Sequence, residues 1–200
     1  MSSSPSCLSL LRTTANSRDE STCIVVASSN DNDGRFRPEW ATPFLSEMKK
    51  MDFIGENGFR EESFLVLLTK PVDVNLNDPN VVIVRIPLTT PGSSFIALLP
   101  KNDGLKLSDL RDGLTMAKLQ KTLQGCSAQY VDLYIPSFTV TSNHNGMNTA
   151  IEISASDDST NRSTSPVLSL LCQPPCIKFD RPFLFGITQE DQVVAFGQYL

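Results

Sequence analysis

Short apolar stretches separated by polar, turn-forming stretches run along most of this chain, and their lengths are typical of β-strands. The first stretch is residues 23–27, which ends at a run of Ser, Asn, Asp and Gly over residues 28–34. Residues 81–88 and 94–99 are joined by the turn signal Thr89-Thr-Pro-Gly-Ser93, which predicts a β-hairpin. The remaining predicted strands are residues 61–69, 129–140, 149–153, 177–187 and 192–198.

Two short helices are predicted between the hairpin and the strand at residues 129–140. Ser108 is a suitable N-cap for a helix over residues 109–112. Thr115 is a second N-cap, and the apolar spacing over residues 116–123 predicts a helix that ends at Gly125. The strands dominate and the helices are few, so the fold class is α+β with antiparallel sheets.

Polar tracts set the domain organisation. Residues 1–21 are rich in Ser, Thr and Asn without apolar periodicity, which predicts a flexible leader before one domain at residues 22–200. Residues 154–165 are predicted to be a solvated connection. A chain of 200 residues that is 40% hydrophobic can bury one core, and this composition excludes collagen, coiled coils and wholesale disorder.

The charge and the apolar run lengths exclude several classes of partner. The net charge is −5 and the 17 basic residues are scattered, so neither nucleic acid nor an anionic membrane surface is an expected partner. The longest apolar runs, such as residues 95–99, fall far short of the roughly 18 residues that span a bilayer. Residues 1–11 lack the basic start and sustained apolar run of a secretory signal.

The cysteines and the single histidine do not form a recognisable catalytic or metal site. Five cysteines at irregular spacings indicate mostly free thiols rather than a disulfide framework: Cys7, Cys23, Cys126, Cys172 and Cys176. A zinc clip at Cys172-Gln-Pro-Pro-Cys176 is disfavoured by its two prolines and by the distance to His144. His144 lies in a turn-like composition, and hydrolase and nucleotide-binding motifs are absent. We therefore expect no enzyme activity, cofactor or metal.

Several motifs together resemble the C-terminal half of the serpin family. They are Trp40-Ala-Thr-Pro-Phe44, the hairpin that ends at Pro100, the strand at residues 131–136, and Phe179-Asp-Arg-Pro-Phe-Leu-Phe185 with Ala195-Phe196-Gly197. The matching positions are Trp40, Pro43, Phe44, Phe179, Pro182, Phe183, Phe185 and Gly197. The resemblance runs from about residue 22 to residue 200 and implies a partial serpin fold with an exposed reactive loop at about residues 155–175.

The family chain is about twice this length, so the resemblance implies an N-terminally truncated member. It also implies an internal deletion between Val140 and Thr149. Residues 23–27, 128–140 and 149–153 are then expected to form an incomplete sheet with exposed edges. A monomer is expected, with self-association through these edges as an alternative. A further alternative is that the chain does not fold independently, because too little area is buried.

The resemblance also implies how the chain acts. In the family, a loop before the Phe-Asp-Arg-Pro-Phe segment is bait for a protease, and after cleavage it inserts as a strand into the main sheet. The paired prolines Pro174-Pro175 place the scissile bond between Leu171 and Cys172. Leu171 implies a serine protease with an apolar primary pocket, either chymotrypsin-like or elastase-like. Family likeness implies an extracellular location, with a cytoplasmic location as the alternative.

The would-be hinge of the reactive loop departs from the family pattern of Gly followed by Ala and Thr. Its residues are Asp157, Asp158, Ser159, Thr160, Asn161 and Arg162. Insertion would turn at least one of their charges toward the interior at a cost of several kcal/mol if unpaired, and Pro166 removes a ladder donor. Asn161-Arg-Ser163 fits a glycosylation sequon, and a glycan there would obstruct insertion. A plain solvated linker, and a non-inhibitory relative that is a protease substrate or binding module, remain alternatives.

Overall fold

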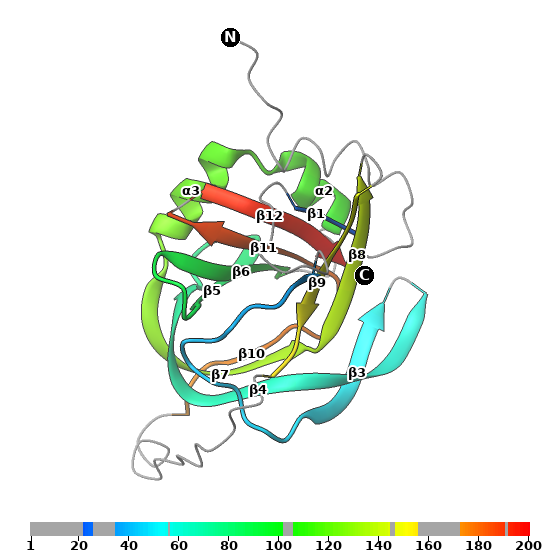
Figure 1. Cartoon of the computed structure of the whole chain (residues 1–200). Helices are drawn as coiled ribbons and strands as arrows, with labels where there is room; N and C mark the ends of the chain where they lie inside the picture. Colours follow the sequence, from blue (N-terminus) through cyan, green and yellow to red (C-terminus); the bar gives the residue numbers. More distant parts are fainter. Residues whose placement is uncertain are drawn as a thin grey trace.

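A computed structural model describes residues 22–25, 35–55, 57–101, 106–144, 147–155, 173–190 and 192–200. Its elements fall into two β-sheets and two helices (Figure 1). In chain order they are β1 (Thr22–Val25), β2 (Arg35–Phe36), β3 (Lys49–Gly55), β4 (Gly58–Asn75), β5 (Val81–Pro87), β6 (Ser93–Pro100), α2 (Leu107–Gly113), α3 (Met116–Gln124), β7 (Ser127–Pro136), β8 (Phe138–His144), β9 (Met147–Ile153), β10 (Cys176–Lys178), β11 (Phe183–Gln189) and β12 (Gln192–Tyr199).

The larger sheet has nine strands in the order β1-β12-β11-β6-β5-β4-β7-β10, and β3 pairs with β4 beside this path. The 18-residue strand β4 connects the parts of the sheet, because it pairs in turn with β3, β7 and β5. All these pairings are antiparallel except that of β10, which runs parallel to β7. The sheet therefore curves around a common core, with β10 at one end and β1 at the other.

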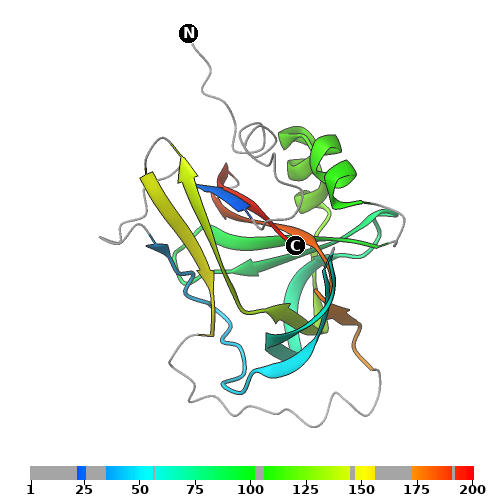
Figure 2. The ribbon, with the colours of Figure 1, turned by 90° about the vertical axis from the view of Figure 1, so that its right-hand side faces the viewer.

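Both faces of the larger sheet are covered where β5, β6, β11 and β12 lie, as the alternation along β6 shows. Phe95, Ala97 and Leu99 point to one buried cluster, while Ile96 and Leu98 point to another. The second cluster contains Leu107 of α2, its C-cap Leu114, and Leu119 and Leu123 of α3. Figure 2 shows the helices and the β8–β9 hairpin on opposite sides of this sheet.

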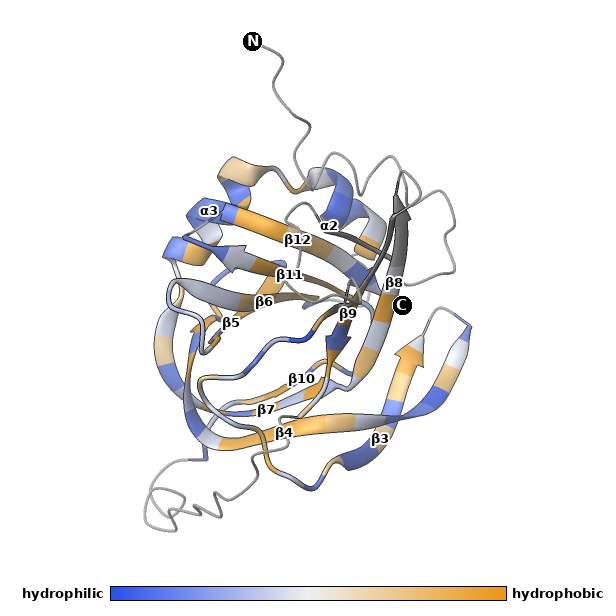
Figure 3. Cartoon of the chain, viewed as in Figure 1, coloured by the Kyte–Doolittle hydropathy of each residue, from blue (hydrophilic) through white to orange (hydrophobic). Residues whose placement is uncertain are grey.

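The smaller sheet has the order β2-β9-β8 and packs on the face opposite the helices. Its residues Val140, Ile151 and Ile153 join the main cluster, which also holds most of the aromatic side chains. In Figure 3 apolar colouring runs along much of β4 and the middle of β12, the strands that line this core. The structure thus confirms a strand-dominated α+β fold, with its larger core cluster between the two sheets.

The local signals for the hairpin and the second helix are confirmed. β5 and β6 pair around a turn in which the Ser93 amide donates to the Thr90 carbonyl at 3.0 Å and Gly92 has φ +75°. Thr115 caps α3 by accepting a 3.2 Å hydrogen bond from the Lys118 amide. The helix ends at Gly125, as the sequence predicts.

The start of α2 differs from the prediction. Its N-cap is Lys106, without a side-chain hydrogen bond, rather than Ser108. The Lys106 carbonyl accepts from the amides of Asp109 and Leu110, which places Ser108 inside the first turn. Leu107 is buried with the helix cluster, and this packing sets where the helix begins.

Two long predicted strands are each divided in the structure. Residues 177–187 form β10 and β11, which lie in different parts of the larger sheet. Residues 129–140 are divided at Ser137, where the chain passes from the larger sheet in β7 to the smaller sheet in β8. Pro136 and Pro182 lie at these breaks and lack the amide that a continuous ladder needs.

The expected incomplete sheet is also wrong in its composition. Residues 23–27, 128–140 and 149–153 do not share one sheet, because β1 pairs with β12 and β7 pairs with β4 and β10. Of the strands in these three segments, only β8 and β9 lie in the smaller sheet. The third strand of that sheet is β2. Residues 1–21 lie outside the described residues.

Candidate functional site

The predicted reactive bond Leu171–Cys172 and the predicted hinge at residues 157–162, including Asn161, lie outside the described residues. The structure describes the chain on both sides of them. β9 and residues 154–155 lead into this segment, and Gln173, Pro174 and Pro175 lead from it into β10. These two sides fix where the chain leaves the smaller sheet and where it enters the larger one.

The incoming side is held by two hydrogen bonds at the end of β9. The Trp40 indole Nε1 donates to the Ser154 carbonyl oxygen at 2.8 Å. The Ser137 hydroxyl donates to the Ile153 carbonyl oxygen at 3.0 Å. Ile153 itself is fully buried, so β9 enters the segment from a fixed position.

Trp40 is able to hold β9 because its own position is fixed. The indole is 4% exposed and packs edge to face on Phe44 and Phe95, with ring centroids 4.9 and 5.5 Å away. Its backbone forms an isolated bridge with Leu88, the residue after β5. Trp40 and Phe44 therefore join the β5–β6 hairpin to β9, and Pro43 between them is half-buried.

The outgoing side is held by Asp132 of β7. Its amide donates to the Pro175 carbonyl oxygen at 3.0 Å, immediately before β10 pairs with β7. Its carboxylate Oδ1 accepts from the Thr69 amide at 2.8 Å. Thr69 has φ +51° at a bulge in β4, a backbone conformation that is uncommon for a β-branched residue. Asp132 thus connects the β4 bulge to the residues that follow the predicted bond.

The Phe179–Phe185 motif forms the centre of the core rather than a surface. Phe179, Phe183 and Phe185 are fully buried, with the Phe179 and Phe183 rings 5.0 Å apart. Pro182 is half-buried. Gly197 is buried opposite Phe185 in the β11–β12 pairing. The family positions found in the sequence are thus structural positions of this fold.

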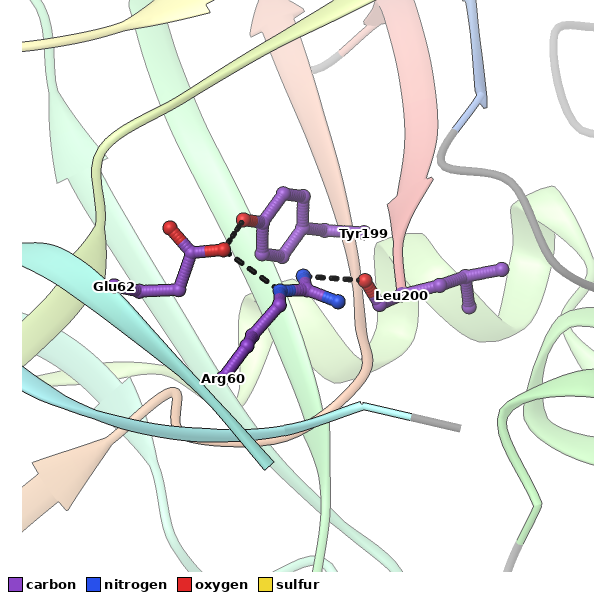
Figure 4. A network of polar contacts seen from close by, with 4 residues as sticks. All are labelled: Arg60, Glu62, Tyr199 and Leu200. Atoms are coloured by element: carbon purple, nitrogen blue, oxygen red, sulfur yellow. Dashed lines mark hydrogen bonds and ion pairs between the residues drawn. The ribbon is translucent and has the colours of Figure 1, made fainter. Parts of the chain in front are cut away.

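A polar cluster at the chain's last residues was missed by the sequence analysis (Figure 4). Arg60 donates to the Leu200 carbonyl oxygen at 2.6 Å and to Glu62 Oε1 at 2.7 Å, and the Tyr199 hydroxyl donates to the same Glu62 oxygen at 3.0 Å. The Arg60 guanidinium also lies over the Phe53 ring, 4.4 Å from its centroid. The sequence pattern does not indicate this cluster, because Glu62 and Tyr199 are 137 positions apart and Arg60 and Leu200 are 140 positions apart.

Burial shifts the acidity of two groups in the core. It raises the pKa of the Tyr199 hydroxyl above its ordinary value, although the neighbouring Arg60 guanidinium acts in the opposite direction. Burial, with a smaller contribution from Asp73, raises the pKa of the Cys126 thiol to about 11. Both groups therefore keep their protons at neutral pH, and neither is arranged as an acid or a nucleophile.

The described residues bear on two other kinds of site, a metal centre and a membrane span. Among them, no His, Cys, Asp and Glu side chains gather in threes to hold a metal ion. No helix in the described part of the chain is long and apolar enough to cross a bilayer. His144 is the last residue of β8, opposite Met147 in the hairpin with β9.

Comparison with known families identifies the fold. The family model described as Serpin (serine protease inhibitor) matches residues 31–157, which is more than half of the chain. The chain belongs to the serpin family. This confirms the resemblance carried by the aromatic motifs, and the matched region runs from before β2 to just after β9.

Individual serpins are similar over part of their length. Serine proteinase inhibitor 2 of variola virus is 24% identical over 151 residues, which are 68% of this chain and 39% of the relative. The structure of native protease nexin-1 with heparin has a TM-score of 0.67 at 19% identity and covers 82% of this chain. The thermophilic serpin tengpin in its native state has a TM-score of 0.68 at 15% identity. This chain spans 53% and 58% of those two structures, and 39% of the viral relative.

Proposed function

We propose that this serpin inhibits a serine protease by offering residues 155–175 as bait, with Leu171–Cys172 as the bond that is attacked. Membership of the family is the observation that carries the proposal, and the viral relative is itself named a serine proteinase inhibitor. The apolar side chain of Leu171 suits a chymotrypsin-like or elastase-like primary pocket.

The covalent step follows from ordinary serine protease chemistry. The protease serine oxygen attacks the Leu171 carbonyl carbon, and the amide bond to Cys172 breaks. The Cys172 nitrogen leaves with a proton, and an ester joins Leu171 to the protease. Inhibition then requires that the loop leave its exposed position before water hydrolyses the ester.

The pairing of the smaller sheet favours insertion of the loop beside β9. β2 and β9 run parallel and are matched through Arg35↔Ala150 and Phe36↔Ile151. A segment that folds back directly after β9 would run antiparallel to both strands, which needs only a hairpin connection. Separating the two-residue strand β2 from β9 breaks few ladder hydrogen bonds.

The hinge charges oppose this insertion. Asp157 and Asp158 are adjacent, so their side chains would face opposite sides of an inserted strand, and one of them would face the core in either register. Arg162 shares the register of Asp158. This observation favours a second candidate function, a non-inhibitory serpin that is cleaved as a substrate or acts as a binding module.

A denaturing gel distinguishes the two functions. The chain is incubated with chymotrypsin and, separately, with pancreatic elastase. An inhibitor gives a boiling-resistant covalent complex of chain and protease, whereas a substrate gives only two fragments. A matched variant, Leu171→Arg, should lose the reaction with chymotrypsin and gain it with trypsin. If Leu171→Arg is attacked by chymotrypsin as fast as the unaltered chain, the assignment of the bond is wrong.

Loop insertion has a second readout. A chain nicked between Leu171 and Cys172 should melt at a clearly higher temperature than the intact chain, because the inserted strand adds ladder hydrogen bonds and buried area. An unchanged melting temperature would support the substrate or binding function instead.

A further inference from the structure

One face of the larger sheet, at the strand that follows the predicted bond along the chain, is exposed. We call it the outer face of β4, β7 and β10, strands that lie next to one another in Figure 1. Its residues are Leu68, Pro71, Tyr130, Asp132, Cys176 and Lys178. Their common orientation follows from the register, which matches Pro71 with Tyr130 and Cys176 with Asp132. The alternate positions Leu133 and Ile177 are buried in the core.

Two large apolar side chains stand out on this face. Tyr130 is 53% exposed and Leu68 is 41% exposed. Tyrosine is enriched among the residues that dominate binding energy at protein interfaces. The other large apolar side chains that are exposed in the described part of the chain are Met48, Ile54 and Phe59, on or just before the β3–β4 hairpin.

Leu68 is held outward by the bulge of β4. Leu67 pairs with Leu133 and Lys70 pairs with Val131, so Leu68 and Thr69 together lie opposite the single residue Asp132. The Asp132 carboxylate fixes the bulge through the Thr69 amide at 2.8 Å. The apolar surface is therefore preorganised, which lowers the entropy cost of contacting a partner.

The short chain between the bond and the sheet decides which partner meets this face. The Pro175 carbonyl is bonded to the Asp132 amide, and Cys176 is already paired in the sheet. Four residue steps separate Cys172 from Cys176, which even fully extended span at most about 14 Å. A protease that grips the Leu171–Cys172 bond is therefore held close to β10, within reach of the outer face. A protease–inhibitor interface of ordinary size buries about 800 Å² on each partner, which is more than a few bait residues supply.

We propose that the outer face of β4, β7 and β10 is a second contact surface for the captured protease, with Tyr130 and Leu68 as its apolar anchors. The inference rests on the proposed function, and it adds a docking surface outside the bait. It assigns Tyr130 and Leu68 to the approach of the protease rather than to the chemistry of the bond. The surface should therefore change the rate of attack and leave the fate of the acylated chain unchanged.

The test compares the intact chain with Tyr130→Ala, Leu68→Ser and a control variant, Phe59→Ala. Phe59 is 77% exposed at the tip of the β3–β4 hairpin, away from the outer face. The measured quantity is the second-order rate constant for attack by chymotrypsin or elastase, whichever attacks faster. The bond is identified by the mass of the fragment that begins at Cys172. A synthetic peptide of residues 164–175 gives the rate for bait without the surface.

We expect Tyr130→Ala and Leu68→Ser each to lower the rate constant several-fold to about tenfold, toward the rate of the peptide. Phe59→Ala should react at the unaltered rate, and the ratio of complex to cleaved chain should be the same in all variants. Thermal melting checks that each variant is folded. Each surface variant tests the contribution of its own side chain to the rate constant.

The outcomes separate this inference from the proposed function. If the unaltered chain is not attacked between Leu171 and Cys172, the proposed function is wrong and this inference is wrong with it. If it is attacked there, and both surface variants react at the unaltered rate, only the docking surface is wrong. Equal slowing of Phe59→Ala and the surface variants would also overturn the inference, because the effect would not belong to the outer face.

Discussion

The Trp40 indole nitrogen donates a 2.8 Å hydrogen bond to the Ser154 carbonyl oxygen. These residues are 114 positions apart, and the bond joins the aromatic motif near the start of the domain to the residue that directly follows β9, before the bait segment. Trp40 therefore has two roles, as a core aromatic and as the partner of a backbone carbonyl that no longer belongs to a sheet ladder.

Replacing Trp40 with Phe should lower the free energy of unfolding by about 2 kcal/mol, because both the hydrogen bond and part of the ring volume are lost. Chemical denaturation measures the change. Ser137→Ala, which removes only the 3.0 Å bond to the Ile153 carbonyl, should cost about 1 kcal/mol. A Trp40→Phe chain as stable as the unaltered one would mean that this bond contributes nothing.

The hinge charges should limit inhibition in a register-dependent way. Asp157→Ala will raise the ratio of complex to cleaved chain if odd positions face the core, whereas Asp158→Ala combined with Arg162→Ala will raise it if even positions do. The effective change should be about tenfold or more, since burying an unpaired charge costs several kcal/mol. Gel densitometry after reaction with chymotrypsin gives the ratio. If neither change raises it, the charges do not oppose insertion.

Ionisation of Tyr199 should lower the free energy of unfolding at alkaline pH. Burial raises its pKa in the folded chain above the ordinary value, so its contribution is complete below about pH 10 and is lost as the pH rises through the folded pKa. The melting temperature of the unaltered chain should therefore fall more steeply above pH 10 than that of Tyr199→Phe. Parallel curves for the two chains would contradict the assignment. At pH 7 the same variant loses the bond to Glu62 and should be about 1 kcal/mol less stable.

Gly186 in β11 should not tolerate a methyl group. An added Cβ would lie 2.8 Å from Phe196 Cδ2 and 2.9 Å from the Ala195 carbonyl oxygen. Gly186→Ala should lower the free energy of unfolding by about 2–3 kcal/mol through overpacking. Gly113→Ala is the matched control, because a Cβ there meets no atom within 4 Å. A similar small effect at both sites would show that the β11–β12 contact can relax.

Cys126 and Cys176 should differ in reactivity. Burial raises the pKa of the Cys126 thiol to about 11, so only about one thiol in a thousand is ionised at pH 8. Cys176 is exposed on β10. Iodoacetamide labelling followed by peptide mass spectrometry should show much slower modification of Cys126 than of Cys176. Equal rates would mean that Cys126 is exposed in solution.

The sequence by itself determined the features that depend on neighbours along the chain. The β5–β6 hairpin follows from the turn at Thr89–Ser93, and α3 follows from Thr115 and Gly125, because these signals act over a few residues. The aromatic motifs from Trp40 to Phe185 also identified the family, since core positions of a fold constrain residue type.

Only the tertiary structure decided features that depend on distant partners. Residues 177–187 divide into β10 and β11 because β7 and β6 offer separate edges, and α2 begins at Leu107 because the helix cluster buries that side chain. Asp132 connects Thr69 to Pro175, and Arg60 meets Tyr199 and Leu200, across separations that no local pattern reports. Local periodicity fixes which segments become strands, but the pairing of those strands depends on packing that exists only once the chain is folded.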